Sequence, residues 1–226
     1  NASKVSVLIK DLKIDYYRIP LPVVLSDASH GNMTHFDFIT ARVVTDQGIE
    51  GVGYTFTPGT GGAAIHAMAD RDLREVVVGQ DARQIEQLWE RMWWHVHFAG
   101  RGGALVFAIS AIDIALWDIA GKVANEPWWR LLGGQDNKVR TYAGGVDLQF
   151  TTEALVKQTE GFLDQGFRAI KMKVGREKLS EDVGRIAVIR EVLGPDLPLM
   201  VDANMGWRVD EAIRAARAFA DQDLYW

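Results

Sequence analysis

Two lysines and a later aspartate–asparagine pair are the residues whose types and spacing could do chemistry. Lys171 and Lys173 lie one residue apart in the apolar run FRAIKMKVG, and Asp202 and Asn204 have the same spacing at the end of the run LPLMVDAN. Residues two apart on a strand project to the same face, so each pair would present both side chains together. Two ammonium groups held close lower each other's proton affinity, which would allow one lysine to act as a base near pH 7.

The oxygen-bearing pair indicates a second kind of chemistry. Carboxylate and amide oxygens such as those of Asp202 and Asn204 are hard ligands suited to Mg²⁺. Each pair alone also has a purely structural explanation. Lysines at strand ends are usually solvated, and an Asp-x-Asn after a strand often only caps a turn. Both pairs at equivalent strand ends favour a functional site over these alternatives.

The segment that carries both pairs alternates strands and helices. Between its apolar runs lies one amphipathic helix each time, which predicts parallel strands joined by right-handed crossovers. Both a barrel and an open doubly wound sheet fit this alternation, and in both the chemistry lies at the C-terminal ends of the strands. The apolar runs begin at Val139, Phe167, Leu197 and Leu224.

The first part of the chain has a different pattern of predicted strands and helices. A β-rich run from Val5 to Leu21 is followed by two strand-like runs around a turn at residues 46–48, which predicts an antiparallel sheet. Three helical patterns follow, over 62–78, 81–98 and from Ala104 onwards. This is an α+β unit ending near Gly134. The apolar helix from Ala104 is too short and too charged for a membrane span, and we interpret it as a core helix.

Composition narrows the function classes. Of the 226 residues, 48% are hydrophobic and 24% are charged, as in a globular protein with ample core. The net charge of −5 and the lack of a basic run disfavour nucleic acid as a partner. There is no cysteine, so disulfides, thiolate metal sites and thiol nucleophiles are excluded. The absence of cysteine fits a cytoplasmic protein, the stretch from Ala104 is not expected to enter a membrane, and the first residues lack a signal-peptide layout.

The motifs KMK at Lys171–Lys173 and VDANMGW about thirty residues later resemble the mandelate racemase and muconate-lactonising branch of the enolase superfamily. The helix AISAIDIALWDIAGK and the LLGG that follows it extend the resemblance over the entire chain. The family fold implied is an α+β capping domain, residues 1–134, followed by a modified TIM (β/α) barrel. Residues 135–226 would supply about four of its eight strands.

The resemblance implies a role for each site residue. Lys173 would be the base that removes the proton α to a substrate carboxylate, and Lys171 would hold a carboxylate oxygen. Asp202 would be the first of three carboxylate ligands to Mg²⁺, with the other two beyond Trp226, and Asn204 would be a polar contact in the same site. A cation at the carboxylate would stabilise the ene-diolate that deprotonation forms.

The same resemblance implies a sugar-acid substrate and a homo-oligomer. Within the family, the lysine pattern favours dehydration of an acid sugar to a 2-keto-3-deoxy acid, with racemisation, epimerisation or cycloisomerisation as alternatives. The polar loop LSDASHGNMTHF would bring Asp27, Ser29 and His30 to sugar hydroxyls, although a solvated loop explains its composition equally well.

Two hypotheses of other classes remain open. A polypeptide that ended at Trp226 could not assemble the metal site alone, and would be a non-catalytic half-barrel with an exposed strand edge that needs a partner. The other reading is that the chain is a portion of a longer enzyme, whose further strands would supply the two remaining metal carboxylates. The loop GTGGAA at residues 59–64 matches a loose dinucleotide-binding pattern, but its strand belongs to an apparent antiparallel hairpin.

Overall fold

The computed structural model describes residues 7–226 and divides into two compact units. The first unit comprises the residues up to 20 together with 35–138, and the second comprises 21–34 together with 139–226. The β-rich run expected from Val5 begins outside the described residues and continues as β1 (Ile9–Asp27). The chain therefore passes between the units more than once, and the boundary at residues 134–135 stays a prediction.

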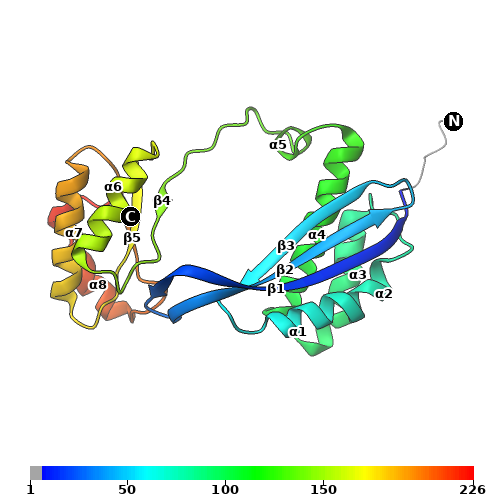
Figure 1. Cartoon of the computed structure of the whole chain (residues 1–226), viewed down its shortest axis with the longest axis horizontal. Helices are drawn as coiled ribbons and strands as arrows, with labels where there is room; N and C mark the ends of the chain where they lie inside the picture. The colour runs from blue at the N-terminus through cyan, green and yellow to red at the C-terminus, as the bar shows by residue number, and fades with distance from the viewer. Residues whose placement is uncertain (1–6) are drawn as a thin grey trace. The chain divides into compact units, whose positions relative to one another are not determined.

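The sheet of the first unit has the order β1-β2-β3, with β2 at Gly31–Thr45 and β3 at Glu50–Thr57. β2 and β3 are antiparallel, and their register places Val44 opposite Glu50, so the predicted hairpin is confirmed (Figure 1). Because β3 is antiparallel to β2, the glycine-rich loop that follows it does not lie in a parallel dinucleotide-binding unit.

Helices cover one face of this sheet (Figure 1). The predicted helix over 62–78 is interrupted by a π-helical stretch, which separates two short α-helices. The elements are α1 (Gly62–Ala67), η1 (Met68–Leu73), α2 (Arg74–Val77), α3 (Ile85–Val96), η2 (His97–Ala99), α4 (Ala104–Ala124) and α5 (Trp128–Leu131).

Helix α4 packs directly on β3 because two strand residues are glycines. A Cβ on Gly51 or Gly53 would lie 2.1 Å or 2.0 Å from a backbone oxygen of α4. Within the described residues, α4 is the one helix long and apolar enough to cross a membrane by length and composition, and half of its apolar stretch is buried inside the protein. Ile109 and Leu116 are fully buried in the core, as a core helix requires.

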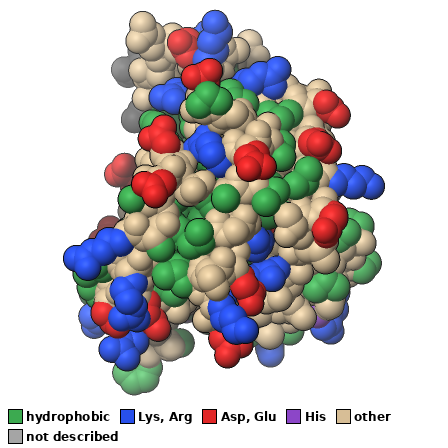
Figure 2. Space-filling view, turned by 90° about the vertical axis from the view of Figure 1, so that its left-hand side faces the viewer, with side chains coloured by type: hydrophobic (Ala, Val, Ile, Leu, Met, Phe, Trp, Pro, Cys, Tyr) green, Lys and Arg blue, Asp and Glu red, His purple; other side chains and the backbone are tan. Residues whose placement is uncertain are grey.

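The second unit alternates strands and helices, as the sequence predicts (Figure 1). Its parallel sheet has the order β4-β5-β6, and Leu224 forms an isolated parallel bridge with Leu199 of β6. Figure 2 shows the helix-covered side of this unit, where positive and negative side chains are interspersed. The elements are β4 (Ala143–Gly144), α6 (Thr152–Asp164), β5 (Ile170–Lys173), α7 (Leu179–Leu193), β6 (Leu199–Asp202), α8 (Val209–Ala218) and η3 (Ala220–Gln222).

The tip of the β1–β2 hairpin belongs to the second unit. Ser26 forms a parallel bridge with Asp147. The backbone N–H of Ser26 donates to Val146 at 3.0 Å, and the N–H of Leu148 donates to Ser26 at 3.0 Å. Residues 21–34 thus extend the barrel-type sheet beyond the end of β4, and they bring the loop after Ser26 to the C-terminal ends of the strands.

Candidate active site

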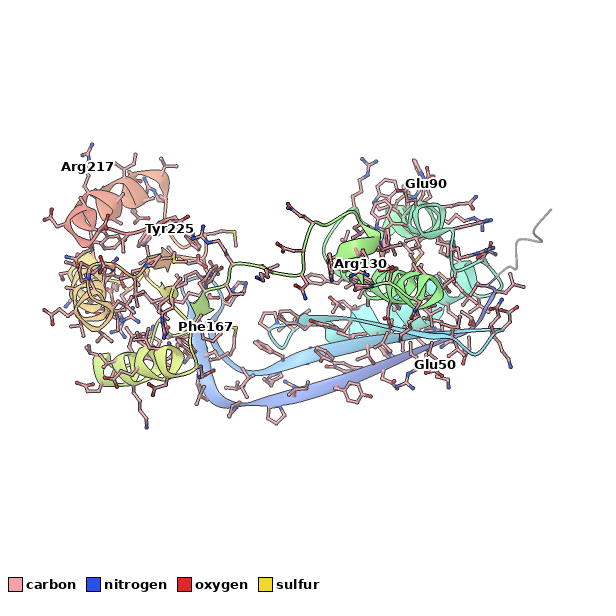
Figure 3. The ribbon with its side chains drawn as sticks, turned by 90° about the horizontal axis from the view of Figure 1, so that it is seen from above. Glu50, Glu90, Arg130, Phe167, Arg217 and Tyr225 are labelled. Carbon is pink, nitrogen blue, oxygen red and sulfur yellow. The ribbon has the colours of Figure 1, made fainter. Side chains whose placement is uncertain are left out.

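Both lysines of β5 converge on one carboxylate of β6. The Nζ of Lys173 lies 2.8 Å from Oδ2 of Asp202, and the Nζ of Lys171 lies 3.1 Å from the same oxygen. Figure 3 labels Phe167, which precedes β5, and Tyr225, in the segment that pairs with β6, and so locates this sheet. The structure brings together the lysines and the aspartate that the sequence predicts to be neighbours.

Strand alternation and register place these groups. Ile170 and Met172 of β5 are buried in the core against the helices, which directs the alternate side chains Lys171 and Lys173 to the opposite face. The parallel register pairs Lys173 with Asp202, the last residue of each strand. Lys173 is only 5% exposed, so its amine stands in a largely water-free environment.

The carboxylate of Asp202 is strongly held in its charged form. Burial alone would raise its pKa, but hydrogen bonds from Lys173, from the backbone N–H of Asn204 and from Lys171 lower the pKa to about 2. Asp202 is therefore ionised throughout the neutral range. An ionised carboxylate is the form that binds a divalent cation.

Asn204 adds a free acceptor beside this carboxylate. Its φ of 46° lies in the left-handed region, and its backbone N–H donates to Oδ1 of Asp202 at 2.8 Å. The side-chain Oδ1 of Asn204 is buried and has no hydrogen-bond partner in the described structure. Across residues 7–226, no three acidic or histidine side chains come together to hold a metal ion. Mg²⁺ therefore fits a carboxylate oxygen of Asp202 and Oδ1 of Asn204 as two ligands of a larger set.

Lys171 differs from Lys173 in its aromatic surroundings. Its Nζ lies 5.5 Å from the centre of the Tyr142 ring and 5.7 Å from that of Trp226, and the two rings meet edge to face. Aromatic faces attract a cation, and Asp202 adds a full negative charge. The two rings and the Asp202 carboxylate therefore surround the Lys171 amine on several sides.

The predicted sugar-contact residues form a tight turn in the hairpin tip. Asp27 accepts hydrogen bonds from the backbone N–H groups of Ser29 and His30, at 2.9 Å and 2.7 Å, and its Oδ2 lies 2.9 Å from Nδ1 of His30. The Ser29 hydroxyl donates to the backbone carbonyl of Asn204. Although burial opposes it, hydrogen bonding from His30 lowers the pKa of Asp27. Asp27 and Ser29 thus build the turn, His30 leaves its ring half exposed, and their contact with sugar hydroxyls stays a prediction.

Ala28 locks this turn onto the strand ends. A Cβ placed on Gly175 would lie 2.8 Å from the Ala28 methyl group, and one placed on Gly206 would lie 2.6 Å from it. Real Cβ atoms do not approach so closely. Glycine at these two positions therefore lets the hairpin tip sit directly on the loops that follow β5 and β6.

Replacing Gly206 with alanine is expected to loosen the hairpin tip, because the new methyl group would collide with Ala28. We expect the amide protons of Ser26 and Leu148, which pair the tip with the second unit, to exchange with solvent about tenfold faster, as measured by hydrogen exchange. Gly161→Ala is the matched control, because nothing lies within 4 Å of a Cβ at that helix position. Equal exchange in both variants would contradict the packing role of Gly206.

Sequence reasoning missed a group of buried charges behind β5. Asp147, Asp182 and Arg185 are all less than 5% exposed, and they contact the backbone around Lys173. Asp147 follows a glycine pair, and Arg185 lies on a helix whose charged residues resemble an ordinary solvated face. Only the three-dimensional arrangement distinguishes them from surface residues.

The parallel strand–helix alternation, with convergent charged groups at the strand ends, defines a (β/α)-barrel protein with an antiparallel capping sheet. Residues 13–133 match the N-terminal domain model of mandelate racemase / muconate lactonizing enzyme, and residues 154–226 match the enolase C-terminal domain-like model. The chain belongs to this family of the enolase superfamily.

Three known proteins illustrate the similarity. The chain is 54% identical to the 3,6-anhydro-alpha-L-galactonate cycloisomerase of Streptomyces coelicolor, over 97% of this chain and 61% of that protein. The crystal structure of a racemase from Streptomyces coelicolor A3(2) with bound magnesium has a TM-score of 0.95 and 55% identity, over 97% of this chain and 61% of that one. The L-talarate/galactarate dehydratase of Salmonella typhimurium LT2, liganded with Mg and L-lyxarohydroxamate, has a TM-score of 0.93 and 33% identity. That match covers 100% of this chain and 59% of the dehydratase chain. The chain thus spans about 61% of the length of the cycloisomerase.

Proposed function

We propose that the full-length protein removes the proton α to the carboxylate of a sugar acid, with Lys173 as the base. The observation that carries this proposal is the placement of the Lys173 amine: it is nearly buried, it lies at the C-terminal end of a barrel strand, and it faces the ionised Asp202 at 2.8 Å. Catalytic groups of a (β/α) barrel gather at this end of the strands, so the Lys173 amine lies where a base of this fold would act.

We also propose that Mg²⁺ is the cofactor. Asp202 and Asn204 would hold it together with ligands from outside the described residues, and magnesium-bound relatives support this reading. The cation would offset the negative charge that develops on the substrate carboxylate when the α-proton leaves. Lys171 would donate a hydrogen bond to the same carboxylate, held in place by Tyr142 and Trp226.

Cycloisomerisation of an anhydro sugar acid is the reaction that we favour. The relative with 54% identity carries this name, which supports the cycloisomerase alternative more than the dehydration expected from the lysine pattern. In a 3,6-anhydro acid, the ether oxygen sits on the carbon β to the carboxylate. The α-carbon would lose its proton to Nζ of Lys173, and the β-carbon–oxygen bond would then break with its electron pair left on oxygen. Protonation of that oxygen would leave an enol whose hydroxyl is on the α-carbon. Loss of this hydroxyl proton, together with addition of one proton to the β-carbon, would give an isomeric 2-keto acid.

Dehydration is the second candidate, and it shares the first half of this chemistry. When the β-substituent is a free hydroxyl, the same elimination releases water and forms a 2-keto-3-deoxy acid. The dehydratase relative with 33% identity supports this candidate. Return of a proton to the opposite face of the α-carbon would instead give racemisation. The three outcomes differ in the fate of the leaving group, whereas the role proposed for Lys173 is common to all.

One experiment separates these outcomes. The full-length enzyme is incubated with Mg²⁺ in deuterated water and with a 3,6-anhydro acid or an aldarate, and the products are analysed by mass spectrometry and NMR. We expect the anhydro acid to give a deuterated product of unchanged elemental composition. If only the aldarate reacts, with loss of water, dehydration rather than cycloisomerisation would be the reaction. Recovery of substrate deuterated at the α-carbon would indicate racemisation. An absence of deuterium from every compound would overturn the proposed function.

We further propose a cytoplasmic homo-oligomer. The outward face of β3 presents Val52, Tyr54 and Phe56, each close to half exposed, and such an apolar strip on a sheet favours association with a second copy. Light scattering of the full-length protein measures this association, and Tyr54→Lys on the strip is expected to weaken it.

A further inference from the structure

A buried cluster of charges lies behind the proposed base and has no part in the chemistry described above. Asp147 and Asp182 are completely buried, and Arg185 is 4% exposed. Burial raises the pKa of Asp147 and lowers that of Arg185, because this environment disfavours the charged form of each side chain. Buried ion pairs rarely stabilise a fold by themselves, so a cluster of this kind calls for another explanation.

The cluster holds the backbone of Lys173 from both sides. The N–H of Lys173 donates to Oδ1 of Asp147 at 2.9 Å, and the carbonyl of Lys173 accepts from Nη1 of Arg185 at 2.8 Å. The other terminal nitrogen of Arg185 donates to the backbone carbonyl of Asp147 at 2.9 Å. Both polar groups of the Lys173 backbone are therefore fixed by side chains from outside β5.

Strand pairing alone would leave this position open on one side. β4 ends at Gly144, and the last backbone bond from that neighbourhood to β5 runs from Gly145 to Lys171 at 3.0 Å. The side chain of Asp147 occupies the place that a longer β4 would fill. Gln158 of α6 holds Asp147 in turn, with its Nε2 2.7 Å from Oδ2.

The same cluster also fixes the loop that follows the base. Oδ2 of Asp182 accepts from the backbone N–H groups of Gly175 and Arg176, at 2.8 Å and 3.0 Å, and Oδ1 of Asp182 lies 3.5 Å from Nη1 of Arg185. Asp182 and Arg185 both belong to α7. One helix thus holds the end of β5 and the start of the next loop.

We propose that Arg185 is a positioning residue, which sets the Lys173 backbone so that its amine meets the substrate α-carbon. This inference rests on the proposed role of Lys173 as the base. The planar guanidinium of Arg185 donates to two backbone carbonyls in a fixed geometry and lies 3.5 Å from the Asp182 carboxylate, whereas a lysine ammonium is a flexible point charge. A displacement of about 1 Å at the reacting atoms can reduce a rate about 100-fold. The position in which the Arg185 guanidinium holds the Lys173 backbone therefore matters for catalysis.

The test compares two arginines of α7 in the full-length enzyme. Arg185→Lys is expected to reduce kcat about 100-fold with little change in KM, and to raise the primary isotope effect on kcat with α-deuterated substrate, because proton removal becomes the slowest step. Arg190→Lys is the matched control: Arg190 also bonds backbone carbonyls, including those of Leu197 and Gln222, but it does not contact Lys173. We expect it to lower thermal stability and to leave kcat and the isotope effect unchanged.

An unchanged kcat in Arg185→Lys, or a fall that Arg190→Lys reproduces without a change in the isotope effect, would overturn the proposal. If Arg185→Lys does not fold, Asp147→Asn decides. This variant weakens the hydrogen bond to the Lys173 N–H but retains an acceptor there. We therefore expect about a tenfold lower kcat and a raised isotope effect. An unchanged isotope effect would refute the positioning role of the cluster. Failure of the underlying function is distinguishable, because α-proton exchange would then survive the loss of Lys173.

Discussion

Lys173→Met in the full-length enzyme is expected to abolish the exchange of the substrate α-proton with deuterated solvent. Methionine has a similar length and is tolerated in buried places, but it carries no group that can accept a proton. General base catalysis typically contributes 10²–10⁴-fold, so turnover should fall by at least about a thousandfold. The measurement is the loss of the α-proton signal by NMR in the presence of Mg²⁺.

Two further variants make this result specific. Lys171→Met removes the neighbouring amine and is expected to slow exchange without abolishing it, since the role proposed for Lys171 is to hold the substrate carboxylate rather than to take its proton. Lys157→Met changes an exposed lysine of α6 and should leave exchange unaltered. Exchange at the wild-type rate in Lys173→Met would show that another residue is the base.

Asp202→Asn is expected to lower the affinity for Mg²⁺ at least tenfold and to remove most activity. The amide keeps the size of the side chain and an acceptor for the backbone N–H of Asn204, but it removes the negative charge that a divalent cation needs. It also changes the group that the amines of Lys171 and Lys173 contact, at 3.1 Å and 2.8 Å from Oδ2. Calorimetric titration with Mg²⁺ measures the affinity directly, without reference to turnover.

The matched control for this variant is Asp196→Asn, which changes an exposed aspartate just before β6, at the opposite end of the strand. It should bind Mg²⁺ like the wild type. If Asp202→Asn also retained wild-type affinity, the assignment of Asp202 as a metal ligand would be wrong, whatever the effect on activity.

The sequence predicts the arrangement of the central residues well because strand geometry is local. The two-residue spacing of Lys171 and Lys173 determines that they share a face, and the same run determines that Ile170 and Met172 face the core. The position of Asp202 at the end of the next parallel strand follows from the strand–helix alternation. The carboxylate and the two amines therefore meet as expected.

Other features depend on contacts between distant residues, and no local pattern indicates them. The rings of Tyr142 and Trp226 meet around Lys171 although one precedes and the other follows the strands in between. The bond from Arg185 to Asp147 joins residues 38 positions apart. Asp27 illustrates this as well: its carboxylate accepts hydrogen bonds within its own turn, which the polar composition of the loop does not indicate, and its contact with a sugar stays a prediction.

The type of reaction is also beyond what these residues encode. Removal of an α-proton is common to cycloisomerisation, dehydration and racemisation, so the roles proposed for the lysine pair and Asp202 would serve each of them equally. The choice depends on which group leaves the β-carbon and on which acid delivers the next proton. These depend on the substrate and on side chains other than the base, which explains why the lysine pattern favours dehydration while the relative with 54% identity is a cycloisomerase.

The β1–β2 hairpin, whose tip belongs to the second unit, has a consequence for how the chain folds during its synthesis. The bond from the backbone of Gln149 to the Ser26 hydroxyl joins residues 123 positions apart. At about 5–20 residues per second, a ribosome would finish the hairpin tip on the order of ten seconds before its partner residues emerge. During that interval Ser26 and its neighbours present an unpaired strand edge, a known starting point for aggregation. The second unit should therefore form late, and the nascent chain should be most vulnerable before Leu148 is synthesised.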